Sequence, residues 1–262
     1  YYPLSLLMMA GIREVLIIST PRDLPSFREL LGDGDRFGMR FEYCEQPSPD
    51  GLAQAFILGR DFLAGDPACL VLGDNILHGH GLPEMLKRCA GLTEGARIFA
   101  YRVRDPERYG VVEFDADARA LSIEEKPENP RSPYAVPGLY FYGPDVSDLA
   151  SRLEMSDRGE LEITDLNRRY LSEDRLTVEV LGRGFAWLDA GTHRSLIEAS
   201  SFVQAIEDRQ GLKVGCLEEI AWDHGWITIE GLQREVDAAG KSSYGDYLRE
   251  VLARAEDERA GA

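Results

Sequence analysis

The alternation of apolar, strand-like runs with helical segments restricts the fold of this sequence more than any other feature. The runs Glu14–Ser19 and Ala68–Leu72 are almost continuously apolar, which is typical of strands covered on both faces. Segments with apolar residues at helical spacing, such as Gly51–Leu63, separate these runs. Strands and helices that alternate at this spacing predict βαβ units and a largely parallel sheet.

The pattern changes along the chain, but no linker interrupts it. From Ala96 onward short strands and turns dominate, with a hairpin turn expected at Asp115–Asp117, and after Thr192 the pattern is helical. We therefore expect an α/β fold, a Rossmann-like three-layer arrangement in which helices flank a mixed, mostly parallel sheet. We divide it into an α/β domain over residues 1–210 and a helical C-terminal appendage over residues 211–262, packed on that domain.

Charge and composition exclude several classes of partner. The 262 residues include 46 Asp and Glu against 29 Lys and Arg, a net charge of −17 that repels nucleic acids and anionic membranes. The apolar stretch Leu4–Ile12 is too short to span a bilayer. The four cysteines lack CxxC spacing and the density of a disulfide scaffold. We expect a cytoplasmic protein in which local cations or a metal ion attract any phosphate-bearing substrate.

Two aspartates follow apolar strands at the positions where open α/β sheets bind ligands. Asp74 comes after Leu70–Gly73, and Asp189 comes after Trp187-Leu188. Two such carboxylates, brought together in space, could share Mg²⁺, which prefers hard oxygen ligands. Taken singly, each aspartate is more often a turn former or a helix cap.

Two further stretches carry groups suited to a nucleotide or a sugar phosphate. In the proline-set loop Gln46–Ala55, the Gln46 amide can pair with a nucleobase edge, and Gly51 leaves room for a flat group. Glu125 and Lys126 place a carboxylate for hydroxyls beside an ammonium for phosphate. An ordinary strand-to-helix connection and a solvated strand end would explain the two stretches equally well.

Several common sites are absent from the sequence. It contains no GxGxxG, GxxxxGKS/T, HExxH or GxSxG motif, and its four histidines are too scattered for a zinc site.

Six segments, in order along the chain, together resemble the glucose-1-phosphate thymidylyltransferases, a family of bacterial sugar nucleotidyltransferases. They are Gln46–Ala55, Leu72–Asn75, Asp105–Val112, Glu124–Pro127, Gly159–Asp165 and Trp187–His193. The resemblance runs from Tyr1 to about Leu252. It implies condensation of dTTP with glucose 1-phosphate to give dTDP-glucose and pyrophosphate.

The resemblance also implies a role for each matching residue. Asp74 and Asp189 would hold Mg²⁺ and, with Lys126, carry catalysis, while Gln46 and Gly51 would meet the nucleotide together with Asp74. The sugar-phosphate pocket would be formed by Asn75, Tyr109, Gly110, Glu125, Lys126, Val136 and Trp187. Because both reactants are anions, positive charge and positioning would carry most of the catalysis, and the ionised phosphate monoester would need no general base.

Some positions depart from the family pattern or leave its regulation open. The family's glycine-rich first strand and loop, with a phosphate-binding lysine, would lie upstream of Tyr1, and we expect such a segment to precede this sequence. Arg183 and Glu219 match members of a feedback site for a dTDP-sugar inhibitor at subunit contacts. Asp223 stands where relatives often carry a basic residue, which puts anion binding there in doubt. The resemblance also implies a homo-oligomer, a tetramer.

Three alternatives remain open from the sequence. The chain could be a non-catalytic nucleotide-sugar sensor of the same fold, or a uridylyltransferase using UTP. A glycosyltransferase could use Asp115-Ala116-Asp117 as a metal motif. We disfavour that reading because the triplet falls in a predicted hairpin turn, and because such an enzyme would release a nucleoside diphosphate.

Overall fold

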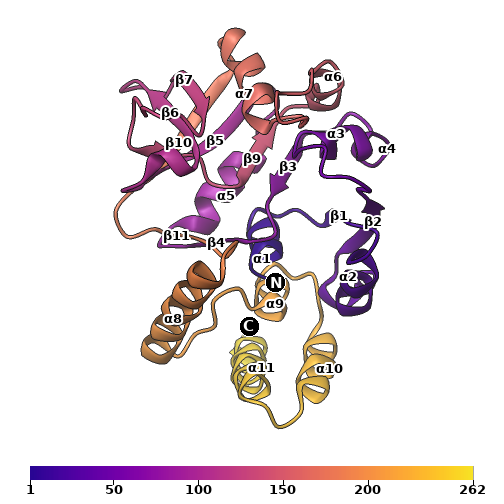
Figure 1. Cartoon of the computed structure of the whole chain (residues 1–262). Coiled ribbons are helices and arrows are strands. Elements are labelled where there is room, and N and C mark those ends of the chain that lie inside the picture. The colour runs from indigo at the N-terminus through magenta and orange to yellow at the C-terminus, as the bar shows by residue number, and fades with distance from the viewer. Residues whose placement is uncertain (262) are drawn as a thin grey trace.

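The computed structural model describes residues 1–261 and has the expected α/β architecture, with sheets flanked by helices (Figure 1). Near the N-terminus two strands pair in parallel, in register from Glu14 opposite Arg40 to Ser19 opposite Glu45. The elements of this part are α1 (Tyr2–Met9), β1 (Glu14–Ser19), α2 (Leu24–Leu31), η1 (Asp35–Phe37) and β2 (Arg40–Glu45).

A seven-stranded sheet forms the centre of the molecule, in the order β3-β9-β5-β8-β6-β7, with β10 also paired to β5. Its strands are β3 (Ala68–Val71), β5 (Ala96–Arg102), β6 (Gly110–Phe114), β7 (Ala120–Glu125), β8 (Tyr134–Ala135), β9 (Leu139–Tyr142) and β10 (Leu176–Leu181). The hairpin turn predicted at Asp115–Asp117 is confirmed between β6 and β7.

The prediction that the sheet is mostly parallel is wrong. Among the described strands, only β1–β2 and β5–β10 pair in parallel, and the other pairings are antiparallel. Strand β9 shows why the sequence misleads, since all four of its residues are buried although it runs antiparallel to both neighbours. Burial on both faces produces an apolar run, but it does not fix the direction of the strand.

A separate antiparallel pair, β4 (Asn75–His78) and β11 (Ala186–Asp189), crosses below the large sheet in Figure 1. Its register sets Asn75 opposite Asp189. Residues that lie far apart in the sequence therefore meet at one end of this pair.

The helices cover the sheets and build the C-terminal part. The single helix expected over Gly51–Leu63 is divided into two short helices at Gly59. The long helix α8 begins with a capping box between Thr192 and Ser195. The remaining helices are α3 (Gln54–Leu58), α4 (Arg60–Leu63), α5 (Leu82–Ala90), η2 (Pro106–Arg108), α6 (Val146–Ala150), α7 (Ile163–Ser172), α8 (His193–Gln210), α9 (Leu217–Asp223), α10 (Ile229–Ala239) and α11 (Ser243–Gly261).

Helices α9, α10 and α11 share their own apolar cluster, which includes the fully buried Leu232 and Leu248. Helix α9 also packs against α1, so the C-terminal helices lie on the N-terminal part of the chain (Figure 1). Each helix among the described residues is too short or too polar to cross a membrane.

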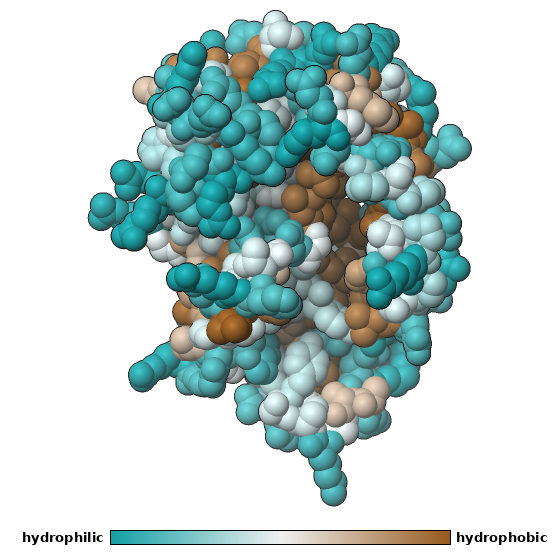
Figure 2. All heavy atoms as spheres, viewed as in Figure 1, coloured by the Kyte–Doolittle hydropathy of each residue, from teal (hydrophilic) through white to brown (hydrophobic). Residues whose placement is uncertain are grey.

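Strand β1 is less buried than its apolar sequence predicts. None of its residues is fully buried, because it pairs with β2 alone, and β3 likewise lies at the edge of the large sheet. Figure 2 shows apolar side chains at the bottom of a hollow on this face of the molecule, in the region where Figure 1 places β3 beside the β1–β2 pair.

Candidate active site

Asp74 and Asp189 lie side by side. The backbone N–H of Ala190 donates to the carbonyl of Asp74 at 2.8 Å. A Cβ atom added to Gly191 would lie 3.0 Å from Asp74 Oδ2 and 3.6 Å from Asp189 Oδ1. The glycine thus leaves a space bordered by both carboxylates, and the structure brings together the two acids that the sequence singled out.

Neutral groups orient these two carboxylates. Asn75 Nδ2 donates to Asp74 Oδ1 at 2.8 Å, and Tyr109 Oη donates to Asp189 Oδ2 at 3.3 Å. Asp189 Oδ1 accepts from the Gly191 N–H at 3.2 Å and from Ser195 Oγ at 3.3 Å. Among residues 1–261, no ion pair involves either aspartate. The two neighbouring negative charges are therefore not paired with a cation of the described chain, and Arg108, on which the charge of Asp189 acts, is itself paired with Asp105.

This donor set fits a hard divalent cation. Both groups supply carboxylate oxygens, Asp74 is exposed, and, apart from its chain neighbours, the only atoms of the described chain within 4 Å of a Cβ added to Gly191 are those carboxylate oxygens. In the described part of the chain, no cluster of three or more potential metal-ligating side chains occurs. A cation held here would therefore take its other ligands from water or from substrate phosphates.

Aromatic side chains form one wall beside the acids. Trp187 Nε1 donates to Asn75 Oδ1 at 2.6 Å, and the Tyr109 ring meets the Trp187 ring edge-on at 5.1 Å between centroids. Burial, and then the charge of Asp189, raise the pKa of Tyr109. Its hydroxyl therefore stays protonated at neutral pH and remains a donor to Asp189.

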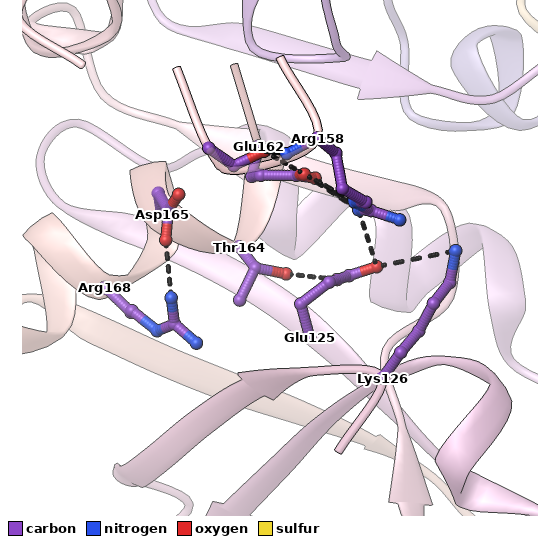
Figure 3. A network of polar contacts seen from close by, with 8 residues as sticks. Glu125, Lys126, Arg158, Glu162, Thr164, Asp165 and Arg168 are labelled. Carbon is purple, nitrogen blue, oxygen red and sulfur yellow. Dashed lines mark hydrogen bonds and ion pairs between the residues drawn. The ribbon is translucent and has the colours of Figure 1, made fainter. Parts of the chain in front are cut away.

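A polar network around Glu125 forms a second wall (Figure 3). Thr164 Oγ1 donates to Glu125 Oε2 at 2.6 Å, while Lys126 Nζ and Arg158 Nη2 lie 3.9 and 3.7 Å from Glu125 Oε1. Arg158 also forms two hydrogen bonds of 2.8 Å from Nη2 to the Glu162 carboxylate. Two cations are thus held over one carboxylate, and Lys126 is more than half exposed.

The backbone links this network to the aromatic wall. The N–H of Lys126 donates to the carbonyl of Tyr109 at 3.0 Å, and Lys126 adopts a positive φ of 42°. Positive φ is unusual for a residue other than glycine and signals local strain. The backbone of Lys126 is therefore held by a hydrogen bond to the residue that also carries the Tyr109 ring.

Gly110 and Val136 complete the second wall. A Cβ atom on Gly110 would lie 3.4 Å from Glu125 Oε2, 3.5 Å from Thr164 Oγ1 and 3.9 Å from Val136 Cβ. On β9, the pKa of Tyr140 is raised by burial and then by the charges of Glu125 and Asp74. The charges of both acids therefore act on the buried Tyr140 hydroxyl, which stays protonated at neutral pH.

Gln46 and Gly51 are held in a compact loop of their own. Gln46 Nε2 donates to the Gly51 carbonyl at 3.2 Å and to Gln54 Oε1 at 2.7 Å. Gly51 has φ +100°, and a Cβ atom there would lie 2.5 Å or less from backbone atoms of Leu161. Close packing against Leu161 therefore explains why glycine is needed at position 51. Contact of Gln46 and Gly51 with a nucleotide stays a prediction.

The two residues expected at a feedback site lie in different parts of the chain. Arg183 is exposed in the turn between β10 and β11, whereas Glu219 on α9 accepts from Tyr247 Oη at 2.5 Å and Arg254 Nη2 at 2.7 Å. No hydrogen bond or ion pair in the described structure joins Arg183 to Glu219. Burial, and then Glu219, raise the pKa of the nearby Asp223.

Reasoning from the sequence overlooked four side chains of the site, namely Tyr140, Arg158, Thr164 and Ser195. The alternation of strand residues after Gly138 could have suggested Tyr140. The segment Gly159–Asp165 contributes to the family resemblance, but no role is predicted for Thr164, which belongs to it, or for Arg158, which precedes it. Ser195 carries no signal of its own beyond its spacing from Thr192, which is typical of a helix cap.

Comparisons of this sequence with a family model and with known proteins point to the same family. The family model described as "Nucleotidyl transferase" matches residues 1–206. The glucose-1-phosphate thymidylyltransferase of Neisseria meningitidis is 56% identical over 252 residues, 96% of this chain and 88% of that protein. The protein of the same name from Mycobacterium tuberculosis is 55% identical over 254 residues, 97% of this chain and 88% of that protein.

Solved structures give the same result at the level of the fold. A putative glucose-1-phosphate thymidylyltransferase from Bacillus anthracis, in complex with a sucrose, aligns with a TM-score of 0.70 at 37% identity. The alignment covers 77% of this chain and 80% of that one. A UDP-glucose pyrophosphorylase complexed with UDP-glucose aligns with a TM-score of 0.62 at 23% identity, over 77% and 84% of the two chains. The second likeness concerns the fold alone.

Proposed function

This chain belongs to the nucleotidyl transferase family, and we propose that it transfers a deoxythymidylyl group from dTTP to glucose 1-phosphate. The products are dTDP-glucose and pyrophosphate. The observation that carries the proposal is the convergence of Asp74 and Asp189, which form no ion pair in the described structure, in a site that also holds Lys126 and Arg158 against Glu125. Such an arrangement suits a reaction between two phosphate-bearing molecules.

The reaction requires one displacement at phosphorus. A phosphate oxygen of glucose 1-phosphate attacks the α-phosphorus of dTTP and forms a new P–O bond. The bond from the α-phosphorus to the bridging oxygen breaks, and pyrophosphate leaves with its electron pair. The attacking phosphate is already ionised at neutral pH, so no residue has to remove a proton.

The divalent cation of this proposal is Mg²⁺, which Asp74 and Asp189 would hold. When bound, it would neutralise phosphate charge during the displacement. Tyr109, Ser195 and Asn75 keep the two carboxylates oriented through neutral hydrogen bonds, so the negative charge of the pair is not cancelled.

The second wall would receive the sugar phosphate. The exposed ammonium of Lys126, with Arg158 behind it, would attract the phosphate, and the Glu125 carboxylate can accept hydrogen bonds from sugar hydroxyls. Gly110 and Val136 leave this wall open to a ring, and Trp187 bounds its other side. Gln46 and Gly51 would contact the thymine.

The test is pyrophosphate release by the full-length protein from dTTP and glucose 1-phosphate in the presence of Mg²⁺, with UTP as the competing nucleotide. Asp74→Asn or Asp189→Asn should lower turnover about a hundredfold or more, the scale for removing one preorganised electrostatic group. Asp117→Asn, in the exposed β6–β7 turn, serves as the matched control and should behave as wild type.

Three results would count against the proposal. Nucleotide-sugar binding without pyrophosphate release would favour a sensor, and a preference for UTP would favour a uridylyltransferase. Near-normal turnover in Asp74→Asn or Asp189→Asn would remove the metal role from the acid pair.

A further inference from the structure

Asn75 connects the acid pair to both sides of the site through three hydrogen bonds. Its Nδ2 donates to Asp74 Oδ1 at 2.8 Å, and its Oδ1 accepts from Trp187 Nε1 at 2.6 Å and from the Gly138 N–H at 3.0 Å. The residue is 4% exposed. We propose that Asn75 is a positioning residue that orients the Asp74 carboxylate toward a divalent cation, an inference that rests on the function proposed above.

The orientation of the Asn75 amide is determined by its surroundings. Trp187 Nε1 and the Gly138 N–H are donors and cannot accept, so the oxygen of the amide has to face them. The amide nitrogen is then directed at Asp74. Gly138 closes the remaining space, because a Cβ atom there would lie 2.8 Å from Asn75 Nδ2 and 2.6 Å from Leu72 side-chain atoms.

This fixed donor distinguishes the two oxygens of Asp74. The hydrogen bond from Asn75 engages Oδ1, while Oδ2 is the oxygen that borders the space at Gly191, across which Asp189 lies. Without that donor the carboxylate could rotate, and repulsion from Asp189 would favour turning it away. Asn75 thus keeps Oδ2 directed to the place where a cation would meet both acids.

The same contacts argue against a primary role for Asn75 in holding the sugar. Its carbonyl oxygen already accepts two hydrogen bonds, and one of its two N–H groups is engaged with Asp74. A buried amide with three partners acts mainly on those partners. Removing such a partner of a metal ligand typically weakens metal binding 10- to 100-fold.

The experiment measures Mn²⁺ binding to the full-length protein by electron paramagnetic resonance of the free ion, with no nucleotide present. Asn75→Ala should raise the dissociation constant for Mn²⁺ about 10- to 100-fold. Asn167→Ala is the matched control, because it removes another buried amide, which accepts from Tyr142 Oη and forms no hydrogen bond with either aspartate in the described structure. This control should change the dissociation constant for Mn²⁺ by less than about threefold, well below the 10- to 100-fold increase expected for Asn75→Ala.

A second readout is the Mg²⁺ concentration for half-maximal pyrophosphate release, which should rise in Asn75→Ala while the KM for glucose 1-phosphate changes little. If Asn75→Ala does not fold, as judged by circular dichroism, Asn75→Ser provides the smaller change. The serine hydroxyl is too short to replace the donor to Asp74, so the same loss of Mn²⁺ affinity is expected.

The outcomes separate this inference from the proposed function. If Asp74→Asn weakens Mn²⁺ binding but Asn75→Ala and Asn75→Ser do not, the metal role stands and the positioning role is overturned. If wild type does not bind Mn²⁺ without nucleotide, or if Asp74→Asn binds it as wild type does, the positioning role is overturned, whereas the proposed function is decided by pyrophosphate release. Equal losses of affinity in Asn167→Ala and Asn75→Ala would show a general effect of losing a buried amide and would overturn the assignment to Asp74.

Discussion

Two sets of neighbouring acids in this protein have opposite surroundings. Asp74 and Asp189 receive hydrogen bonds from neutral groups only. On α9, Glu219 is paired with Arg254 and Tyr247. The neighbouring Glu218, 6% exposed, accepts from Tyr244 Oη and Cys216 Sγ.

The difference shows which acids are available to a ligand. A buried carboxylate has to be compensated by hydrogen bonds or a cation, so the acids on α9 contribute to the folded structure. The acids of the candidate site are oriented by hydrogen bonds but form no ion pair. In the proposed function, a divalent cation that enters from outside the protein relieves the repulsion between their like charges.

The largest expected contrast is between Asp189→Asn and Glu219→Gln. Asp189→Asn should weaken Mn²⁺ binding at least about tenfold, or 1.4 kcal/mol, because a charged ligand is lost. Its midpoint of thermal unfolding should stay unchanged or rise, since a repulsion is removed. Glu219→Gln should leave Mn²⁺ binding unchanged and lower the midpoint. Titration with Mn²⁺ measures the metal affinity, and differential scanning calorimetry measures the midpoint of unfolding. A similar loss of metal affinity in both variants would contradict the expected difference between the two sets of acids.

An effect on stability alone is expected within the α9 acids. Tyr244→Phe removes a donor to the buried Glu218 carboxylate and should lower the free energy of unfolding by about 1–3 kcal/mol. Tyr134→Phe is the control, because no hydrogen bond of the Tyr134 hydroxyl occurs in the described structure. Urea denaturation of both variants gives the comparison. Equal stability of the two would mean that Tyr244 does not compensate Glu218.

The smallest effect concerns alkaline pH. Burial and the neighbouring Glu219 raise the pKa of Tyr247 above its ordinary value, so the folded state holds this proton more tightly than the unfolded state. The resulting stabilisation is complete below about pH 10, the pKa of an unperturbed tyrosine, and is lost as the pH rises through the raised pKa.

Free energies of unfolding measured between pH 8 and pH 11 check this expectation. They should fall less steeply above pH 10 in Tyr247→Phe than in wild type, by up to about 1.4 kcal/mol per pH unit. Tyr109→Phe, beside the acid pair, should change the slope of the free energy of unfolding against pH less, because Tyr109 is more exposed than Tyr247. A larger change of this slope in Tyr109→Phe than in Tyr247→Phe would contradict the expectation.

Local features of the fold could be predicted from the sequence, and non-local ones could not. The apolar run at Glu14–Ser19 and the turn at Asp115–Asp117 depend on neighbouring residues, and both occur where expected. Strand direction depends on which strands become neighbours, so the antiparallel β9 was not foreseen.

The candidate site shows the same limit. Asp74 and Asp189 could be selected because each follows an apolar strand, but only the antiparallel pairing of β4 with β11 shows that they meet. Arg158 and Thr164 acquire their relation to Glu125 from the packing of α7 against β7. Nothing in the spacing of those residues along the chain predicts that contact.

The left-handed backbone at Lys126 has a consequence for engineering this protein. A residue other than glycine in that conformation costs about 1–3 kcal/mol, and glycine would avoid most of it. A screen that selects only for heat resistance would therefore favour Lys126→Gly. The same exchange would remove the ammonium that we propose for binding the sugar phosphate, so the more robust variant would be the poorer catalyst.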